Sequence, residues 1–465
     1  MGTPTAGPAA TPATRRLFGT DGVRGVANRE LTPELALSIG RALGARVGAG
    51  ARVLIGRDTR RSGPMLEGAL AAGLASAGAD AALLGVLPTP AVAELVAGSD
   101  AAAGVVISAS HNPFPDNGIK VFGPDGFKLA DADEAAIEAA IEAAAGPRPE
   151  ASELGAVEAS PEGRERYIDA LVGRIDLDLS GLSLVVDCAH GATAVTAPEV
   201  LERLGARVHA LGVEPDGVNI NVGCGSTDLG LLSATVAERG ADLGLAFDGD
   251  GDRVLAVDGR GTPVDGDQIL ALLALDLRRR GRLDGDAVVT TTMTNLGFRR
   301  AMAAEGIEVR WTDVGDRYVI AEMLRGGFVL GGEQSGHLIN LRHGPTGDGL
   351  AGGLQLLAAL AARGEPLESA ARVMERLPQR LVGVRTPRKS ELPSARGVWA
   401  AVDACEHALG EEGRVVVRAS GTEALVRVMV EAPTAEECER WCGVIARAVE
   451  EDLGGEVPSA ADTTG

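Results

Sequence analysis

A serine and a histidine stand side by side in a short polar stretch that follows an apolar run. The stretch, from Gly104 to Gly126, reads GVVISASHNPFPDNGIKVFGPDG. Its apolar start is typical of a buried strand that ends in a loop at the edge of a sheet. Ser110 and His111 lie on that loop, and we expect Lys120 on a second, returning strand. A hydroxyl in such surroundings suits a carrier of a transferred group, although the same residues also form ordinary surface turns.

Three carboxylates follow another apolar run in LGLAFDGDGDRVLAVD, where Asp248, Asp250 and Asp252 alternate with glycines. Like charges this close repel unless a cation neutralises them, and oxygen-only ligands favour a hard cation such as Mg²⁺. A calcium EF-hand is excluded, because its sixth and twelfth positions need glycine and glutamate and here hold Arg253 and Gly259. A plain acidic turn stays the alternative. Arg253 could neutralise a phosphate that bridges the ion.

Two further polar segments follow predicted strands. In LGGEQSGHLIN, Glu333, Ser335 and His337 alternate, so on an extended strand they would share one face. A carboxylate and a hydroxyl there could bind sugar hydroxyls, and His337 could move a proton near neutral pH; a purely structural histidine is the alternative. The second segment, VRWTDVGDRYV, places Gly315 and Asp316 in a polar loop.

The segment VRASGTEALVRVMVE concentrates hydrogen-bond donors around a glycine turn. It contains Arg418, Ser420, Gly421, Thr422 and Arg427. Backbone N–H groups, two hydroxyls and two guanidinium groups would make a phosphate cradle. The alternative is a hairpin whose arginines are simply solvated. Near the N-terminus, RRLFGTDGVRG is typical of a loop that places an arginine, Arg24.

Composition limits the possible partners. The net charge of −21 would repel a polyphosphate backbone, which argues against nucleic acid. The five scattered cysteines do not suggest a disulfide framework, and we expect Cys438 and Cys442 to be packing residues. No apolar run approaches the length of a membrane span. We therefore expect a soluble, cytoplasmic protein.

The elements that must position these residues repeat along the chain. Three segments, which start at Arg52, Leu182 and Asp286, each show a strand, a helix and a second strand. A helix is expected from Asp131, a linker over 146–163, and a last part with two strands and a helix from Ala435. The fold class is therefore α/β, with three similar α/β domains with mixed sheets plus a C-terminal α+β domain. The predicted domains span 15–155, 156–257, 258–376 and 377–453.

In their order along the chain, RRLFGTDGVRG, SASHNP, DGDGDR, GEQSGH and RASGTE resemble the motifs of the α-D-phosphohexomutase superfamily. The resemblance covers nearly the whole chain and implies four domains around a central cleft. FGTDGVRG and GEQSGH are most similar to the branch that acts on amino-sugar phosphates. One departure is Ala424, where the family commonly has proline.

The resemblance also implies a role for each motif. Ser110 would be the phosphoserine, and with the three aspartates it would bind Mg²⁺. Glu333 and Ser335 would bind the sugar, and the RASGTE residues would grip the phosphate that does not react. The groups expected to take part in acid–base chemistry or charge stabilisation are Arg24, His111, Lys120 and His337, with Arg253 and Gly315 as further substrate contacts.

The implied activity is the interconversion of glucosamine 6-phosphate and glucosamine 1-phosphate, which would feed UDP-N-acetylglucosamine and cell-wall synthesis. A sugar bisphosphate, glucosamine or glucose 1,6-bisphosphate, would act as activator. The chain would be a monomer or a homodimer. A mutase for mannose or glucose phosphates, and a non-catalytic sugar-phosphate-binding protein, are the alternatives.

Overall fold

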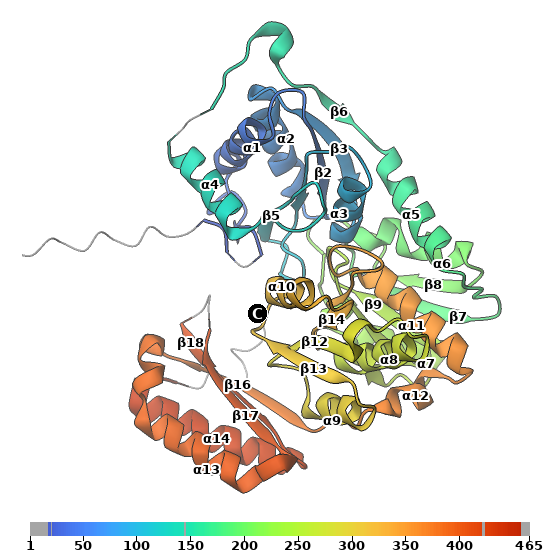
Figure 1. Cartoon of the computed structure of the whole chain (residues 1–465), viewed down its shortest axis with the longest axis vertical. Coiled ribbons are helices and arrows are strands. Elements are labelled where there is room, and N and C mark those ends of the chain that lie inside the picture. Colours follow the sequence, from blue (N-terminus) through green and yellow to red (C-terminus); the bar gives the residue numbers. More distant parts are fainter. Residues whose placement is uncertain (1–16, 20, 144–145, 421–423, 457–465) are drawn as a thin grey trace, which may run out of the picture.

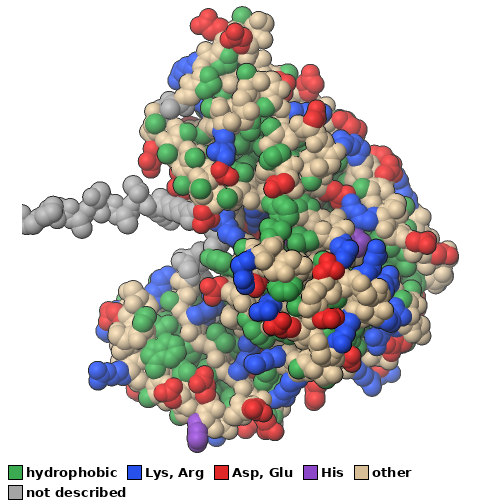
Figure 2. Space-filling view, viewed as in Figure 1, with side chains coloured by type: hydrophobic (Ala, Val, Ile, Leu, Met, Phe, Trp, Pro, Cys, Tyr) green, Lys and Arg blue, Asp and Glu red, His purple; other side chains and the backbone are tan. Residues whose placement is uncertain are grey.

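The computed structural model describes residues 17–19, 21–143, 146–420 and 424–456. Figure 1 shows four units that follow one another along the chain, each built around one of four sheets. The first unit (blue) and the fourth (red) flank the left side of the view, where the space-filling surface is hollowed between them (Figure 2). Within the described residues, no helix has both the length and the apolar character needed to cross a bilayer.

The first sheet has the order β1-β5-β4-β2-β3-β6. Its strands are β1 (Val23–Val26), β2 (Arg52–Arg57), β3 (Asp80–Val86), β4 (Ala103–Ile107), β5 (Asp116–Phe122) and β6 (Val157–Ala159). Its helices are α1 (Pro33–Val47), α2 (Gly63–Ser76), α3 (Thr89–Ala97) and α4 (Asp131–Glu142). Helices α1 and α2 approach closely at Gly40 and Gly73, where an added Cβ would lie 2.2 Å from a carbonyl oxygen of the other helix.

The second sheet has the order β11-β10-β9-β7-β8 and the third the order β13-β12-β14-β15. The strands of the second are β7 (Ser183–Asp187), β8 (Arg207–Leu211), β9 (Leu243–Phe247), β10 (Val254–Asp258) and β11 (Pro263–Val264). Those of the third are β12 (Ala287–Thr291), β13 (Glu308–Thr312), β14 (Leu330–Gly332) and β15 (Leu338–Asn340). The helices of these units are α5 (Glu162–Arg174), α6 (Ala197–Arg203), α7 (Gly230–Arg239), α8 (Gly266–Arg279), α9 (Leu296–Ala304), α10 (Asp316–Gly326), α11 (Gly349–Arg363) and α12 (Leu367–Ala370).

The fourth sheet is antiparallel, with the order β16-β18-β17. It contains β16 (Gln379–Arg385), β17 (Arg414–Ala419) and β18 (Leu425–Glu431), and it packs against α13 (Arg396–Leu409) and α14 (Ala435–Leu453). Its apolar core is separate, whereas one continuous core joins the second and third units to α3 of the first.

The predicted fold class is confirmed. All three predicted strand–helix–strand segments form, as β2-α2-β3, β7-α6-β8 and β12-α9-β13, and the two strands of each are parallel neighbours. Antiparallel strands complete each of these sheets, so they are mixed. The expected helices at Asp131 and Ala435 are present. All five cysteines are free and buried.

Three local predictions were wrong. Arg24 lies on strand β1, paired with Gly118 of β5, and not in a loop. The predicted linker over 146–163 contains β6, which adds to the edge of the first sheet beside β3. Residues 333–337 form the turn of the β14–β15 hairpin and not an extended strand. The domain boundaries stay predictions; β6 and β11 each pair with the sheet that precedes the predicted boundary.

Candidate active site

Ser110 lies on the loop between β4 and β5, at the carboxyl end of β4, and is buried. Its backbone has a φ of 53°, a left-handed conformation that is uncommon for residues other than glycine. The Ser110 hydroxyl donates to Asp248 Oδ2 over 2.6 Å and lies 3.2 Å from His111 Nδ1. The loop therefore presents one hydroxyl to the first carboxylate of the acidic triplet.

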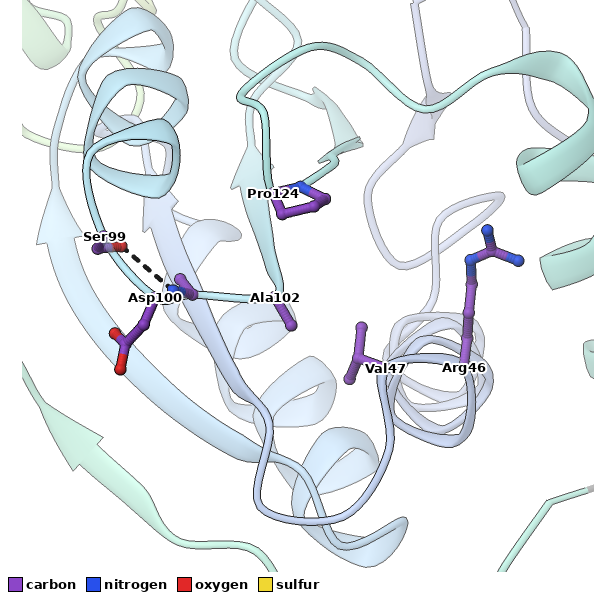
Figure 3. Close-up of a pocket in the computed structure, with 7 residues that line it drawn as sticks. Arg46, Val47, Ser99, Asp100, Ala102 and Pro124 are labelled. Carbon is purple, nitrogen blue, oxygen red and sulfur yellow. Dashed lines mark hydrogen bonds between the residues drawn. The ribbon is translucent and has the colours of Figure 1, made fainter.

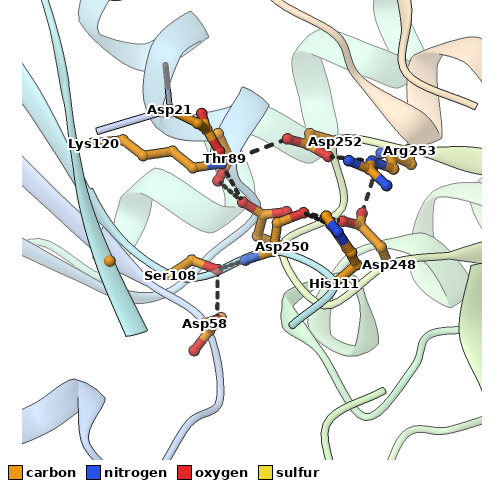
Figure 4. A network of polar contacts seen from close by, with 12 residues as sticks. Asp21, Asp58, Thr89, Ser108, His111, Lys120, Asp248, Asp250, Asp252 and Arg253 are labelled. Atoms are coloured by element: carbon orange, nitrogen blue, oxygen red, sulfur yellow. Dashed lines mark hydrogen bonds and ion pairs between the residues drawn. The ribbon is translucent and has the colours of Figure 1, made fainter. Parts of the chain in front are cut away.

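A buried arginine, Arg60, holds this loop in place. It pairs with Asp58 at 2.8 Å and donates to four loop carbonyl oxygens. These belong to Ser110, Asn112, Pro113 and Asp116. Asp58 also accepts from the Ser108 hydroxyl (Figure 4), and that hydroxyl in turn accepts from the Ser110 N–H. The sequence analysis did not single out Asp58 and Arg60. They lie in GRDTR, a polar segment directly after a predicted strand, and such a segment indicates a loop.

The three aspartates follow β9 and are brought together as predicted. One carboxylate oxygen from each of Asp248, Asp250 and Asp252 lies within 4.8 Å of the others, and all three side chains are buried. Burial, followed by the charges of Asp252 and Asp250, raises the pKa of Asp248 well above its usual value. Among the described residues, Asp250 Oδ1 is buried without a hydrogen-bond partner, and Asp252 Oδ1, also without a hydrogen bond, has only the longer ion-pair contacts to Arg253 and His337. Because unpaired buried carboxylate oxygens are costly, this set fits a divalent cation.

Two side chains of the first unit contact Asp250. The hydroxyl of Thr89, the first residue of α3, donates to Asp250 Oδ2 over 2.7 Å, and Lys120 Nζ lies 3.0 Å from the same oxygen (Figure 4). Lys120, on β5, also lies 3.2 Å from Asp21 Oδ2. Burial alone would lower the pKa of Lys120, but the carboxylates of Asp21, Asp250 and Asp252 outweigh it and raise that pKa.

The two histidines of the site have pKa values that are shifted in opposite directions. Burial, then the charges of Arg253 and Arg24, lowers the pKa of His111 to about 4, so its imidazole is neutral at neutral pH. For His337 the effect of burial is outweighed by carboxylates, chiefly that of Asp252, and its pKa rises to about 9. His337 therefore carries a proton at neutral pH, whereas His111 can accept one.

A cavity of about 950 Å³ joins these groups. The predicted site residues that line it are Arg24, Ser110, His111, Asp252, Arg253, Gly315, Glu333, Ser335 and His337. They come from the first three units. Glu333 accepts from the Gly315 N–H over 3.1 Å. Arg253 Nε is buried and has no hydrogen-bond partner among the described residues, although it lies 3.8 Å from Asp252 Oδ1. An oxyanion is the natural partner for such a guanidinium.

The described residues of the predicted phosphate cradle, Arg418, Ser420 and Arg427, lie on the fourth unit and are not among the described residues that line this cavity. Arg418 on β17 stands directly opposite Arg427 on β18. Burial, then the charge of Arg427, lowers the pKa of Arg418, while Asp313 of the third unit acts in the opposite direction. Ser420 is buried, and its carbonyl accepts from Lys389. Gly421 and Thr422 lie outside the described residues.

A second cavity, of about 680 Å³, lies on the first unit. It is lined by Arg46, Val47, Ser99, Asp100, Ala101, Ala102 and Pro124 (Figure 3). None of these residues is a predicted site residue, and Arg46 is paired with Asp133 at 2.5 Å. The geometry for group transfer is therefore in the larger cavity.

Family models match all four units. They are described as phosphoglucomutase/phosphomannomutase α/β/α domains I, II and III and C-terminal domain, and they match residues 15–147, 165–261, 265–377 and 381–448. A crystal structure of a phosphoglucomutase/phosphomannomutase family protein from Burkholderia thailandensis has a TM-score of 0.81 and 27% identity, and covers 96% of this chain and 99% of its own. The fold and the site thus define a phosphohexomutase.

The curated relatives are more specific. The phosphoglucosamine mutase of Mycolicibacterium paratuberculosis is 51% identical over 439 residues, which cover 93% of this chain and 99% of the relative. That of Geobacillus thermodenitrificans is 51% identical over 444 residues, with 94% and 99% covered. The chain belongs to the phosphoglucosamine mutase family of the α-D-phosphohexomutases.

Proposed function

We propose that the chain interconverts glucosamine 6-phosphate and glucosamine 1-phosphate through a phosphorylated Ser110 and a sugar bisphosphate. The observation that carries this proposal is Ser110, which lines a cavity of about 950 Å³ and whose hydroxyl lies 2.6 Å from Asp248 of the buried acidic triplet. The relatives named phosphoglucosamine mutase support the choice of an amino sugar.

The reaction exchanges one phosphate ester for another. A sugar hydroxyl attacks the phosphorus of phosphorylated Ser110, its proton passes to a base, and the serine oxygen leaves. The resulting bisphosphate turns over in the cavity and returns its other phosphoryl group to Ser110. Most of the catalytic gain in such transfers comes from positioning and from stabilised charge. Ser110, Asp248, Asp250 and Asp252 would hold Mg²⁺, which supplies positive charge to the transferring oxygens.

The chain's own cations and bases surround the same position. Lys120 and Arg24 of the first unit, with Arg253 of the second, would face the negative charge of the phosphoryl group. His111, neutral at neutral pH, and His337, which is protonated, suit opposite roles in proton transfer. Glu333 and Ser335, both in the β14–β15 turn, would bind the sugar hydroxyls or the amine.

The phosphate that does not react would bind to the fourth unit. Arg418 and Arg427 lie opposite each other on the neighbouring strands β17 and β18. This arrangement places two like charges together and favours a bound anion. The charge of Asp313 acts against the lowering of the Arg418 pKa. Asp313 directly precedes Val314, which lines the cavity. With Ser420, Gly421 and Thr422, these arginines would grip the phosphate and determine which end of the sugar faces Ser110.

Replacing Ser110 by alanine tests the covalent step. The variant Ser110→Ala should lose all measurable mutase turnover, because the oxygen that accepts the phosphoryl group is missing, while its circular dichroism spectrum stays unchanged. Intact mass should show one added phosphate on the wild type and none on the variant. The control Ser38→Ala removes a hydroxyl on α1 that donates only to Glu34 O, and it should turn over normally. Near-normal turnover by Ser110→Ala would refute the proposal.

The choice of substrate is tested by comparing turnover on the 1-phosphates of glucosamine, glucose and mannose, with glucosamine or glucose 1,6-bisphosphate as activator. We expect the highest kcat/KM on the amino sugar. A preference for glucose or mannose would assign the chain to another branch of the superfamily. Tight binding of all three without turnover would favour a sugar-phosphate-binding protein.

A further inference from the structure

Six charged side chains form a closed ring beside the cavity, with acids and bases in alternation. In order around the ring they are Lys120, Asp21, Lys128, Asp316, His337 and Asp252. Their side chains are between 1% and 24% exposed. The first three belong to the first unit, the next two to the third, and the last to the second.

The distances around the ring are those of ion pairs. Lys128 Nζ contacts a carboxylate oxygen of Asp21 and lies 2.6 Å from Asp316 Oδ2. His337 lies 3.7 Å from Asp316 through Nε2 and 3.7 Å from Asp252 through Nδ1. On the other side, Lys120 lies 3.2 Å from Asp21 and 3.6 Å from Asp252. Two candidate catalytic groups, Lys120 and His337, are thus joined on one side through Asp252 and on the other through Asp21, Lys128 and Asp316.

Lys128 follows β5 and, like Lys120, is absent from the described residues that line the large cavity, whereas both of its partners, Asp21 and Asp316, line that cavity. Burial would raise the pKa of Asp316, but the charges of Lys128 and His337 outweigh it and lower that pKa. Without the ammonium group of Lys128, Asp21 and Asp316 would face each other as like charges. In a site this buried, an uncompensated charge is costly enough to move side chains.

We propose that Lys128 is a positioning residue for phosphoryl transfer, which fixes Lys120 and His337 relative to each other by linking Asp21 of the phosphoserine unit to Asp316 of the sugar-binding unit. This inference rests on the proposed function. Lys128 does not touch substrate. Its effect passes through Asp21 to Lys120 and through Asp316 to His337.

A neighbouring arginine provides a matched control. Arg317, next to Asp316 on α10, also links the third unit to the first, since it pairs with Asp131 and lies 2.8 Å from Glu134. It is not part of the ring and does not line the large cavity. Its loss should weaken the contact between the two units without disturbing Lys120 or His337.

The experiment compares Lys128→Met, Lys128→Arg and Arg317→Met in the full-length chain, with kcat, KM and thermal midpoint measured for each. A misplaced catalytic group costs about a hundredfold in rate, so Lys128→Met should lower kcat by about ten- to a hundredfold with little change in KM. Lys128→Arg keeps the charge and should recover part of that loss. Arg317→Met should lower the thermal midpoint but keep kcat within about twofold.

A kcat loss in Lys128→Met no larger than that in Arg317→Met would overturn the proposal. If Lys128→Met does not fold, the double variant Lys128→Met/Asp316→Asn, which leaves fewer uncompensated charges, is compared with Asp316→Asn. If kcat is equal in the double variant and in Asp316→Asn, the action of Lys128 through Asp316 is supported. If kcat is lower again in the double variant, the proposal is overturned. Absence of wild-type turnover on every hexose phosphate would instead refute the proposed function.

Discussion

At the scale of single residues, the loop that carries Ser110 depends on a buried arginine outside the described lining of the large cavity. Arg60 is fully buried, and its guanidinium satisfies Asp58 and four backbone carbonyls of the loop. A buried arginine with this many acceptors acts as a scaffold for backbone that has no regular structure. The strained left-handed conformation of Ser110 is held by these contacts.

Replacing Arg60 by methionine should therefore loosen the loop. The change leaves Asp58 as an uncompensated buried charge, so we expect a local destabilisation of about 3–5 kcal/mol. Hydrogen exchange of the peptide that spans 103–122 should become faster, and turnover should fall. The control Arg61→Met changes an exposed neighbour and should shift stability by less than about 0.5 kcal/mol. Unchanged exchange in Arg60→Met would contradict this role.

Sequence alone identified the residues whose chemistry is local. Ser110 beside His111, and three aspartates spaced by glycines, are recognisable within a few positions. Arg60, Thr89 and Lys128 were missed because their partners are far away in the chain. The hydroxyl of Thr89 meets a carboxylate 161 positions later, and Lys128 meets one 188 positions later. Only the fold creates these contacts, and an isolated threonine or lysine in a sequence carries no sign of them.

At the scale of secondary structure, the site is built from the carboxyl ends of strands. β4 leads into the serine loop, β9 into the acidic triplet, and β14 into the turn that carries Glu333 and Ser335. The strand–helix–strand pattern was predictable because apolar periodicity changes clearly between strand and helix. Alternation could not distinguish a strand from the five-residue turn at 333–337, since polar residues also alternate in tight hairpins. Arg24 was placed in a loop because three nearby glycines hid a short strand.

Helix α3 contributes the residue that orients the acidic triplet. Thr89 donates its hydroxyl to Asp250 Oδ2 and its backbone N–H to Asp250 O, over 2.7 and 2.8 Å. Partners of metal ligands commonly contribute tenfold or more to affinity. Thr89→Val should therefore weaken Mg²⁺ binding about tenfold, measured by calorimetry or by Mn²⁺ titration in an electron paramagnetic resonance experiment. Ser99→Ala, beyond the other end of α3, should bind as the wild type does, and equal affinities in both variants would exclude this role for Thr89.

At the scale of the whole molecule, the fourth unit is attached differently from the others. It has its own core, and polar contacts connect it to the third unit. Glu431 accepts from the Leu296 N–H over 2.8 Å, and Arg414 donates to the carbonyls of Thr292 and Thr294. Arg414 and Glu431 are paired at one end of the β17–β18 ribbon, and the predicted cradle lies at the other end. A small rotation about this attachment would thus move the cradle.

We therefore expect substrate to draw the fourth unit toward the cavity. The described cavity lining comes from the first three units alone. A sugar phosphate bound there would present its own phosphate, a second anion beside the phosphate on Ser110, to Arg418 and Arg427. Small-angle scattering should show a smaller radius of gyration with glucosamine 1-phosphate than without ligand. Glucosamine, which has no phosphate, should produce no compaction, and the double variant Arg418→Met/Arg427→Met should not respond to the phosphorylated sugar. Identical scattering profiles of the wild type with and without saturating substrate would show that the cradle does not close on the cavity.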